Sequence, residues 1–135
     1  MASMNKKSLR INPMRLGSAR ITEPESFMPL PHDEIVRYIR ANLARRITLD
    51  EIAEIAELSV FQLVRAFRRE SETTPYGLVL DLRIEHAKQL LARGESIADA
   101  ACCAGFADQS HLTRHFRRRT GSTPKRYASA MRAAA

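Results

Sequence analysis

The stretch GFADQSHLTRHFRRRTGSTPKRY, residues 105–127, contains a glycine turn, a polar run, three consecutive arginines and a Thr-Pro pair. Much of this order occurs earlier, in SVFQLVRAFRRESETTP, residues 59–75. An offset of 49 residues superposes Leu63 on Leu112, Arg65 on Arg114, Phe67 on Phe116, and Thr74-Pro75 on Thr123-Pro124. Upstream, TLDEIA (48–53) matches SIADAA (96–101) at an offset of 48. The chain therefore repeats one structural unit, and the second copy has one extra residue in its turn.

Each copy of the repeat is predicted to form two short helices joined by a tight turn. Side-chain oxygens that cap helix starts stand where these helices would begin, at Thr48, Ser59, Ser96 and Asp108. Pro75 would begin a longer helix, ending at Gly94, whose apolar stripe consists of Leu80, Ile84, Ala87 and Leu91. With a helix before the first copy and another after the second, we predict an all-α fold of about seven helices. It comprises two helix-turn-helix subdomains joined by a long linker helix.

The predicted organisation has four parts. Residues 1–30 form a basic, flexible N-terminal arm, because residues 1–22 contain five Lys or Arg, no acid and no sustained period. Residues 31–74 form the first helix-turn-helix subdomain, 75–93 the linker helix and 94–135 the second subdomain.

Charge is distributed unevenly along the chain. The formal net charge is +7, and residues 109–135 contain seven basic residues and none of the fifteen acids. This balance favours a polyanionic partner, although ribosomal proteins and membrane-surface binders also have it. The placement of the charge beside a polar helix favours nucleic acid.

Neither a secretory signal nor a membrane span is indicated. No apolar run approaches the roughly 20 residues that cross a bilayer. The two cysteines, Cys102 and Cys103, are adjacent and do not form the spaced framework of a secreted disulfide protein. We therefore expect a cytoplasmic protein without membrane association.

The second helix of each copy has an apolar face and an outward face. Val60, Leu63 and Phe67 point one way, and in the second copy Leu112 and Phe116 do so. The outward residues are Phe61, Val64, Arg65 and Arg68 in the first copy, and Gln109, Ser110, Thr113, Arg114 and Arg117 in the second. These side chains suit the base edges and thymine methyls of a DNA major groove. A solvated face would explain one such helix, but the repeated arginine favours nucleic-acid binding.

These residues resemble the DNA-binding region of AraC/XylS-type bacterial transcription regulators. The similarity runs from about Ile35 to Tyr127 and rests on IA in each first helix, LS at the first turn, GFADQSHLTRHF and the paired TP endings. The resemblance implies two helix-turn-helix subdomains that each insert their second helix into the major groove of double-stranded promoter DNA. It further implies a bacterial, nucleoid-associated transcription regulator, with an activator among the expected roles and RNA polymerase as a candidate second partner.

The resemblance also assigns residues by position. The implied base readers are Phe61, Val64, Arg65, Gln109, Ser110, Thr113 and Arg114. The implied phosphate contacts are Ser59, Arg68, Arg69, Thr74, Arg117, Arg118, Thr123 and Lys125. No catalytic residue, metal ligand or cofactor is expected.

The remaining reactive side chains favour structural roles. Cys102 and Cys103 fall in the first helix of the second copy, where we expect small buried thiols. His111 and His115 are four residues apart on one helix, a spacing that could hold a metal, but no further ligand completes the site.

Three functional classes remain distinguishable. The first is a sequence-specific regulator without catalysis, binding DNA as a monomer if it stands alone. The second is a DNA-repair methyltransferase with an acceptor cysteine, and the third is a nucleoid or RNA binder that acts through charge alone. About 30 residues precede the first helix, too few for an effector-binding domain. The chain is expected to be either a stand-alone regulator controlled by its abundance or a domain of a longer one.

Overall fold

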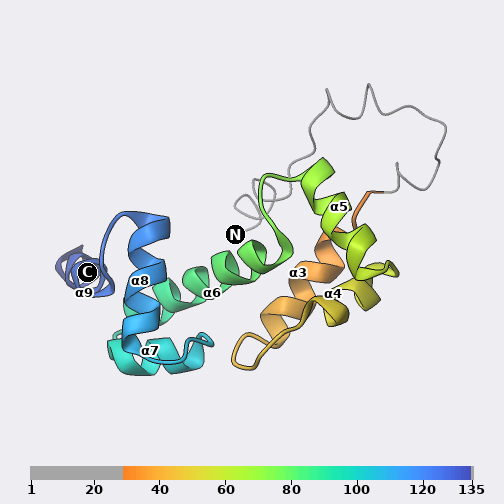
Figure 1. Ribbon diagram of the computed structural model, residues 1–135. Helices are drawn as coiled ribbons and strands as arrows, with labels where there is room; N and C mark the ends of the chain where they lie inside the picture. Colours follow the sequence, from red (N-terminus) through yellow and green to blue (C-terminus); the bar gives the residue numbers. More distant parts are fainter. Residues whose placement is uncertain (1–28, 135) are drawn as a thin grey trace. The chain divides into compact units, whose positions relative to one another are not determined.

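The computed structural model describes residues 29–134, which form seven α-helices and no strand. The helices, labelled in Figure 1, are α3 (His32–Ala41), α4 (Leu49–Ala56), α5 (Val60–Glu70), α6 (Pro75–Ala92), α7 (Ile97–Cys103), α8 (Gln109–Thr120) and α9 (Pro124–Ala134). The all-α prediction of two helix-turn-helix units and a connecting helix is confirmed. The basic arm predicted for residues 1–30 lies, except for its last two residues, outside the described residues.

The chain divides into two compact units. The first contains the described residues up to Ala41 together with Ile47–Leu78, and the second contains Asn42–Arg46 and the residues from Val79 onward. Helix α6 runs through the boundary and contributes its first turn to the first unit and the rest to the second. Each unit thereby has its own helix-turn-helix pair, α4–α5 in the first and α7–α8 in the second.

The core of the first unit is built from α3, α4, α5 and the first turn of α6, which contributes the buried Leu78. Its largest buried side chains are Ile35 and Ile39 of α3, Ile52 of α4, and Leu63 and Phe67 of α5. The inward positions of Leu63 and Phe67 agree with the prediction from helical periodicity. Val60, also predicted to face inward, is only half-buried because it is the first residue of α5 and lies at the margin of the core.

The core of the second unit repeats this plan with smaller residues on its first helix. Leu112 and Phe116 of α8 are fully buried, and they pack in one cluster with the alanines of α7. The predicted stripe of α6 joins the same cluster through Leu80, Ile84, Ala87 and Leu91. Because the alanine side chain is short, α7 can pack closely against its neighbours. This packing holds α8 in place through the buried Leu112 and Phe116.

Hydrogen bonds at the helix starts define the two turns. The side-chain oxygen of Ser59 accepts from the N–H of Gln62, and the Gln62 side chain accepts in return from the N–H of Ser59. Asp108 caps α8 in the second unit by accepting from the N–H of His111 at 2.8 Å. Such caps satisfy backbone donors that a helix start leaves open, and each contributes roughly 0.5–2 kcal/mol.

The longer turn of the second unit depends on Gly105. Its φ of +95° is unfavourable for residues with a side chain, and a Cβ at this position would lie 2.0 Å from the carbonyl oxygen of Leu43. Arg83 of α6 packs beside it and donates from Nε to the Leu43 carbonyl and from Nη2 to the Arg45 carbonyl, at 3.2 and 2.9 Å. These contacts attach the segment Asn42–Arg46 to the second unit.

The cysteine prediction is wrong. Cys102 and Cys103 are both exposed. In α7 the inward positions are taken by Ala100, Ala101 and the following Ala104, so the two residues between them face solvent. The pair is therefore a surface feature of the second unit and not part of its core.

Across residues 29–134, none of the helices combines the length and the apolar character needed to cross a membrane.

Candidate nucleic-acid interface

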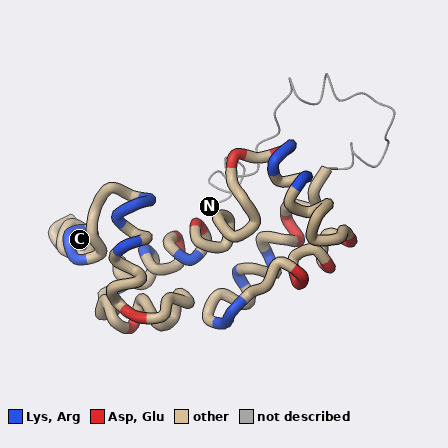
Figure 2. The backbone as a smooth tube through the Cα atoms, viewed as in Figure 1, with Lys and Arg blue, Asp and Glu red and all other residues tan. Residues whose placement is uncertain are grey.

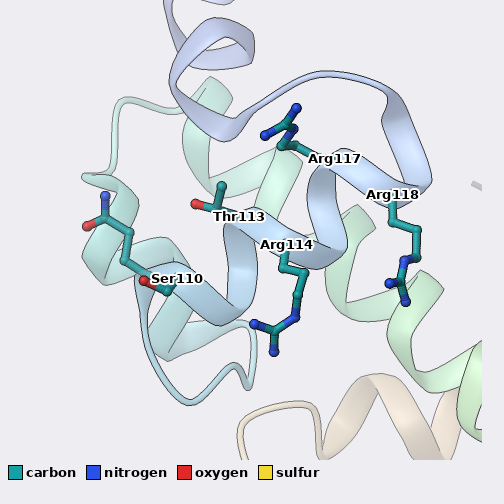
Figure 3. Close-up of a pocket in the computed structure, with 6 residues that line it drawn as sticks. Ser110, Thr113, Arg114, Arg117 and Arg118 are labelled. Atoms are coloured by element: carbon teal, nitrogen blue, oxygen red, sulfur yellow. The ribbon is translucent and has the colours of Figure 1, made fainter.

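Helix α8 presents a continuous polar and positive face. Leu112 and Phe116 lie on its buried side, and its opposite side lines an open groove of about 700 Å³. The residues that line this groove are Gln109, Ser110, Thr113, Arg114, Arg117 and Arg118. Five of them are exposed and Thr113 is half-buried. Figure 3 shows the labelled side chains projecting from α8, so residues that the sequence predicted as one outward set do lie together.

The groove of α8 carries positive charge for two reasons. Three of its six lining residues are arginines and none is acidic. Arg117 and Arg118 also lie in the last turn of α8, where the negative end of the helix dipole stabilises cations. The concentration of basic residues along α8 is visible in Figure 2, where red acidic segments lie instead on helices such as α4.

Helix α5 presents the corresponding face in the first unit, with different chemistry. Phe61 is 68% exposed, Arg65 and Arg68 are exposed, and Val64 is half-buried. The guanidinium carbon of Arg65 lies 5.5 Å from the centroid of the Phe61 ring, which is a cation–π contact. The outward face of α5 is therefore part aromatic and part cationic, whereas that of α8 is entirely polar.

Some arginines at the ends of α5 and α8 are exposed, and others form ion pairs within their own unit. Arg69 is paired with the buried carboxylate of Glu70, with Nη2 3.1 Å from Oε2, and Glu70 also accepts from the N–H of Leu30. Arg119 is paired in the same manner with Asp81 of α6, from Nε to Oδ1 at 2.6 Å. Arg69 was predicted as a phosphate contact, but its side chain is also engaged within its own unit.

The hydroxyl groups predicted to contact phosphates lie at helix starts. Thr74 accepts from the N–H of Gly77 at 2.9 Å, and Thr123 accepts from the N–H of Arg126 at 3.1 Å. Ser59 has the same role at α5. A hydroxyl that accepts within a cap still has a proton to donate, and the adjacent N–H groups favour an anion. Lys125, the fourth candidate near these starts, is exposed on α9.

A cluster of three aromatic rings, those of Phe106, His111 and His115, was not predicted from the sequence. The rings of His111 and His115 are 4.8 Å apart, and both lie near the buried ring of Phe106. The Nδ1 atom of His111 accepts from the N–H of Ala107 in the turn. Burial lowers the pKa of His115, and the neighbouring His111 and three arginines lower it further. Only the four-residue spacing of the two histidines could have indicated this cluster.

Within residues 29–134, no three His, Cys, Asp or Glu residues are grouped so that they could hold a metal ion. The arginines around His115 would also repel a cation.

Comparisons with known proteins identify the type of domain. A family model described as a helix-turn-helix domain matches residues 52–130, more than half of the chain. A transcriptional regulator from Chromobacterium violaceum, described as an AraC-type DNA-binding domain-containing protein, matches with a TM-score of 0.69 and 29% identity over 73% of this chain and 89% of that chain. The DNA-binding domain of the global transcriptional factor AdpA, solved with a target DNA, matches with a TM-score of 0.68 and 29% identity over 76% of this chain and 93% of that one.

A curated relative adds a second activity that belongs to a longer protein. The bifunctional transcriptional activator/DNA repair enzyme AdaA of Bacillus subtilis (strain 168) is 30% identical over 96 residues, which are 70% of this chain and 46% of AdaA. The chain spans 33%, 38% and 46% of the length of three curated relatives that it matches. The family model covers residues of both helix-turn-helix units, and with the similarity to the solved AraC-type domain it shows that the chain belongs to the AraC-type helix-turn-helix family.

Proposed function

We propose that this chain is a sequence-specific, DNA-binding transcription regulator that reads two adjacent major-groove segments of promoter DNA, one with α5 and one with α8. The observation that carries the proposal is the polar, arginine-rich groove of α8, which lies on the face opposite a fully buried Leu112 and Phe116. An α-helix fits the major groove, and amide, hydroxyl and guanidinium groups are the side chains that distinguish base pairs there. The solved complex of the AdpA domain with its target DNA supports the same assignment.

The individual contacts are proposed from exposure and side-chain chemistry. Base readers would be Phe61, Val64 and Arg65 on α5, and Gln109, Ser110, Thr113 and Arg114 on α8. Phosphate contacts would come from the helix-end arginines, Lys125 and the capping hydroxyls, namely Arg68, Arg69, Arg117, Arg118, Lys125, Ser59, Thr74 and Thr123. Among these, Arg69 is expected to contribute least, because its guanidinium is already paired with Glu70.

The wider role is proposed from the same architecture. Because one chain carries both reading helices, we place it on DNA as a monomer, in the cytoplasm with the chromosome. RNA polymerase is proposed as a second partner, as activation of a promoter requires. We assign no catalysis to the chain: the repair activity in the name of AdaA belongs to a protein of which this chain matches 46%.

Selection of bound sequences from a random duplex pool tests the proposal. We expect a strong consensus with two separated blocks, and single-site variants of α5 and α8 that each change one block. Equal binding to random duplex and to the selected sites would support charge-only binding instead. Transfer of a methyl group from methylated DNA to Cys102 or Cys103, detected by mass spectrometry, would support the repair class.

A further inference from the structure

Glu70, the last residue of α5, is a carboxylate in the interior of the first unit and is only 4% exposed. Its two oxygens have different partners. Oε1 accepts from the backbone N–H of Leu30 at 3.0 Å, and Oε2 accepts from Nη2 of Arg69 at 3.1 Å. A buried carboxylate requires donors or a cation, and these two contacts supply both.

Arg69 is turned toward Glu70 and largely away from solvent. Its side chain is 21% exposed, whereas the neighbouring Arg68 is an exposed residue. The Nε atom of Arg69 is buried and has no hydrogen-bond partner within residues 29–134. The guanidinium group has therefore given up hydration for its contact with Glu70.

The second unit has no acid at the corresponding position. The offset of 49 residues places Arg118 at the position of Arg69, and Arg119 at that of Glu70. Arg118 is exposed and lines the α8 groove, while Arg119 pairs with Asp81 of α6. The two equivalent arginines thus differ in exposure, and an acid follows only the one in the first unit.

We propose that Glu70 is a positioning residue that keeps Arg69 from DNA phosphates and thereby lowers the sequence-independent affinity of the first unit. The inference rests on the proposed function, since it requires the end of α5 to lie beside DNA. Phosphate contacts carry no direct information about sequence. A first unit with fewer of them depends more on its base contacts, and replacing Glu70 should strengthen binding to DNA of any sequence.

The balance of interactions favours the ion pair over a phosphate contact. Loss of Arg69 would leave the buried charge of Glu70 with a single backbone donor, which is costly. A phosphate contact at the protein surface is weakened by water and salt. The contact with Glu70 also joins neighbours in one chain, so it costs less entropy than a contact with a separate molecule. Glu70 itself is held in the interior by the N–H of Leu30 and cannot follow Arg69 toward DNA.

The test measures the affinity of the full chain for a random-sequence duplex at several salt concentrations, by fluorescence anisotropy. Glu70→Gln removes the charge and keeps an oxygen that can accept from Leu30. We expect its slope of log affinity against log salt to be steeper than that of the wild type by about 0.9, the contribution of one phosphate contact. Its affinity at 0.1 M salt should rise by up to about eightfold for the same reason.

Matched variants assign the effect to Arg69. Arg69→Gln alone should leave the salt slope unchanged, and the double variant Glu70→Gln/Arg69→Gln should return to the wild-type slope. Glu57→Gln removes an exposed acid from the same unit and should change the slope much less than Glu70→Gln does. This control separates the release of Arg69 from a general effect of net charge. Thermal denaturation shows whether each variant is folded.

Three outcomes overturn the proposal. The first is a folded Glu70→Gln variant with the wild-type salt slope, and the second is an equal steepening in Glu57→Gln. The third is a slope that is smaller by about 0.9 in Arg69→Gln, because Arg69 would then contact a phosphate while Glu70 is present. This last measurement decides the question even if Glu70→Gln does not fold. Failure of the proposed function is distinguishable, since it would make selected and random duplexes bind alike whatever the slopes of the variants.

Discussion

Among the residues that line the α8 groove, Arg114 is the one whose replacement we expect to reduce DNA binding most. It is exposed, it lies between Thr113 and the helix-end arginines, and no acidic residue lines the groove beside it. We expect Arg114→Ala to cost about 1–3 kcal/mol of binding free energy at the selected site, because a bidentate contact to guanine would be lost. Anisotropy titrations with the selected site and with duplexes altered at each position measure this loss.

A charge-preserving variant separates base reading from simple attraction. Arg114→Lys keeps the positive charge but not the planar fork, so it should lose most of the discrimination at one base pair and little of the affinity for random DNA. A uniform weakening on all sequences in both variants would show that Arg114 contacts phosphate and not a base.

His115 makes the stability of the second unit depend on pH. Its pKa is lowered from the ordinary value of 6.5, first by burial and then by His111, Arg119, Arg114 and Arg118. The unfolded chain therefore binds this proton at a higher pH than the folded chain does. The contribution of His115 to the free energy of unfolding should be fully present above pH about 6.5. It should be lost progressively as the pH falls from there toward the lowered pKa of His115.

Urea denaturation at a series of pH values between 5 and 8 checks the direction of this effect. His115→Gln should flatten the pH dependence in that window, because glutamine does not titrate. An unchanged dependence in the variant would assign it to groups other than His115.

At the scale of one element, the last turn of α8 combines two neighbouring arginines with different roles. Arg118 is exposed and lines the groove, whereas Arg119 is half-buried and paired with Asp81 at 2.6 Å. We expect Arg118→Gln to reduce the slope of log affinity against log salt by about 0.9, the contribution of one phosphate contact, without changing stability. Arg119→Gln should instead lower stability by about 1 kcal/mol, since Asp81 loses its partner.

The two variants control for each other because they make the same substitution one residue apart. Thermal denaturation should separate them in Tm, and titrations at several salt concentrations should separate them in slope. If Arg119→Gln changed the salt slope and left the Tm unchanged, the ion pair with Asp81 would not be important for the fold.

The elements were largely predictable because their signals are local. The apolar spacing of Leu80, Ile84 and Ala87 and the capping oxygens of Ser59 and Asp108 depend on residues within one or two turns. Contacts between distant residues were not predictable. Neither the pairing of Arg119 with Asp81 nor that of Arg83 with the carbonyls of Leu43 and Arg45 has a local signature.

The candidate site shows the same limit. Its outward residues followed from helical periodicity, which also separates them from the buried Leu112 and Phe116. The exposure of Cys102 and Cys103 was mispredicted, although Asp99, three and four residues before them on α7, is exposed on the same face of the helix. Side-chain contacts such as that of Phe61 with Arg65 require coordinates, since i and i+4 spacing permits the contact without requiring it.

For the whole molecule, the decisive feature is that two unlike reading helices belong to one chain. The α5 face offers Phe61, Val64 and Arg65, and the α8 face offers only polar side chains. A homodimer of single-headed subunits reads a palindrome, because its two-fold symmetry is repeated in the DNA. A monomer with two different reading helices, α5 and α8, has no such symmetry, so its site should consist of two different half-sites in a fixed order.

We therefore expect the selected consensus to be non-palindromic and one chain to bind each site. Stoichiometric titration above the Kd should saturate at one chain per duplex, and inverting one half-site should weaken binding even though both half-sites remain present. Arg65→Ala and Arg114→Ala should each weaken the base preference of a different half-site, because Arg65 belongs to α5 and Arg114 to α8. A palindromic consensus with two chains per duplex would mean that each chain contributes one head. In that case only one helix-turn-helix unit of each chain would read bases. If Arg65→Ala and Arg114→Ala instead reduced the preference at the same base pairs, the two units would not read separate half-sites.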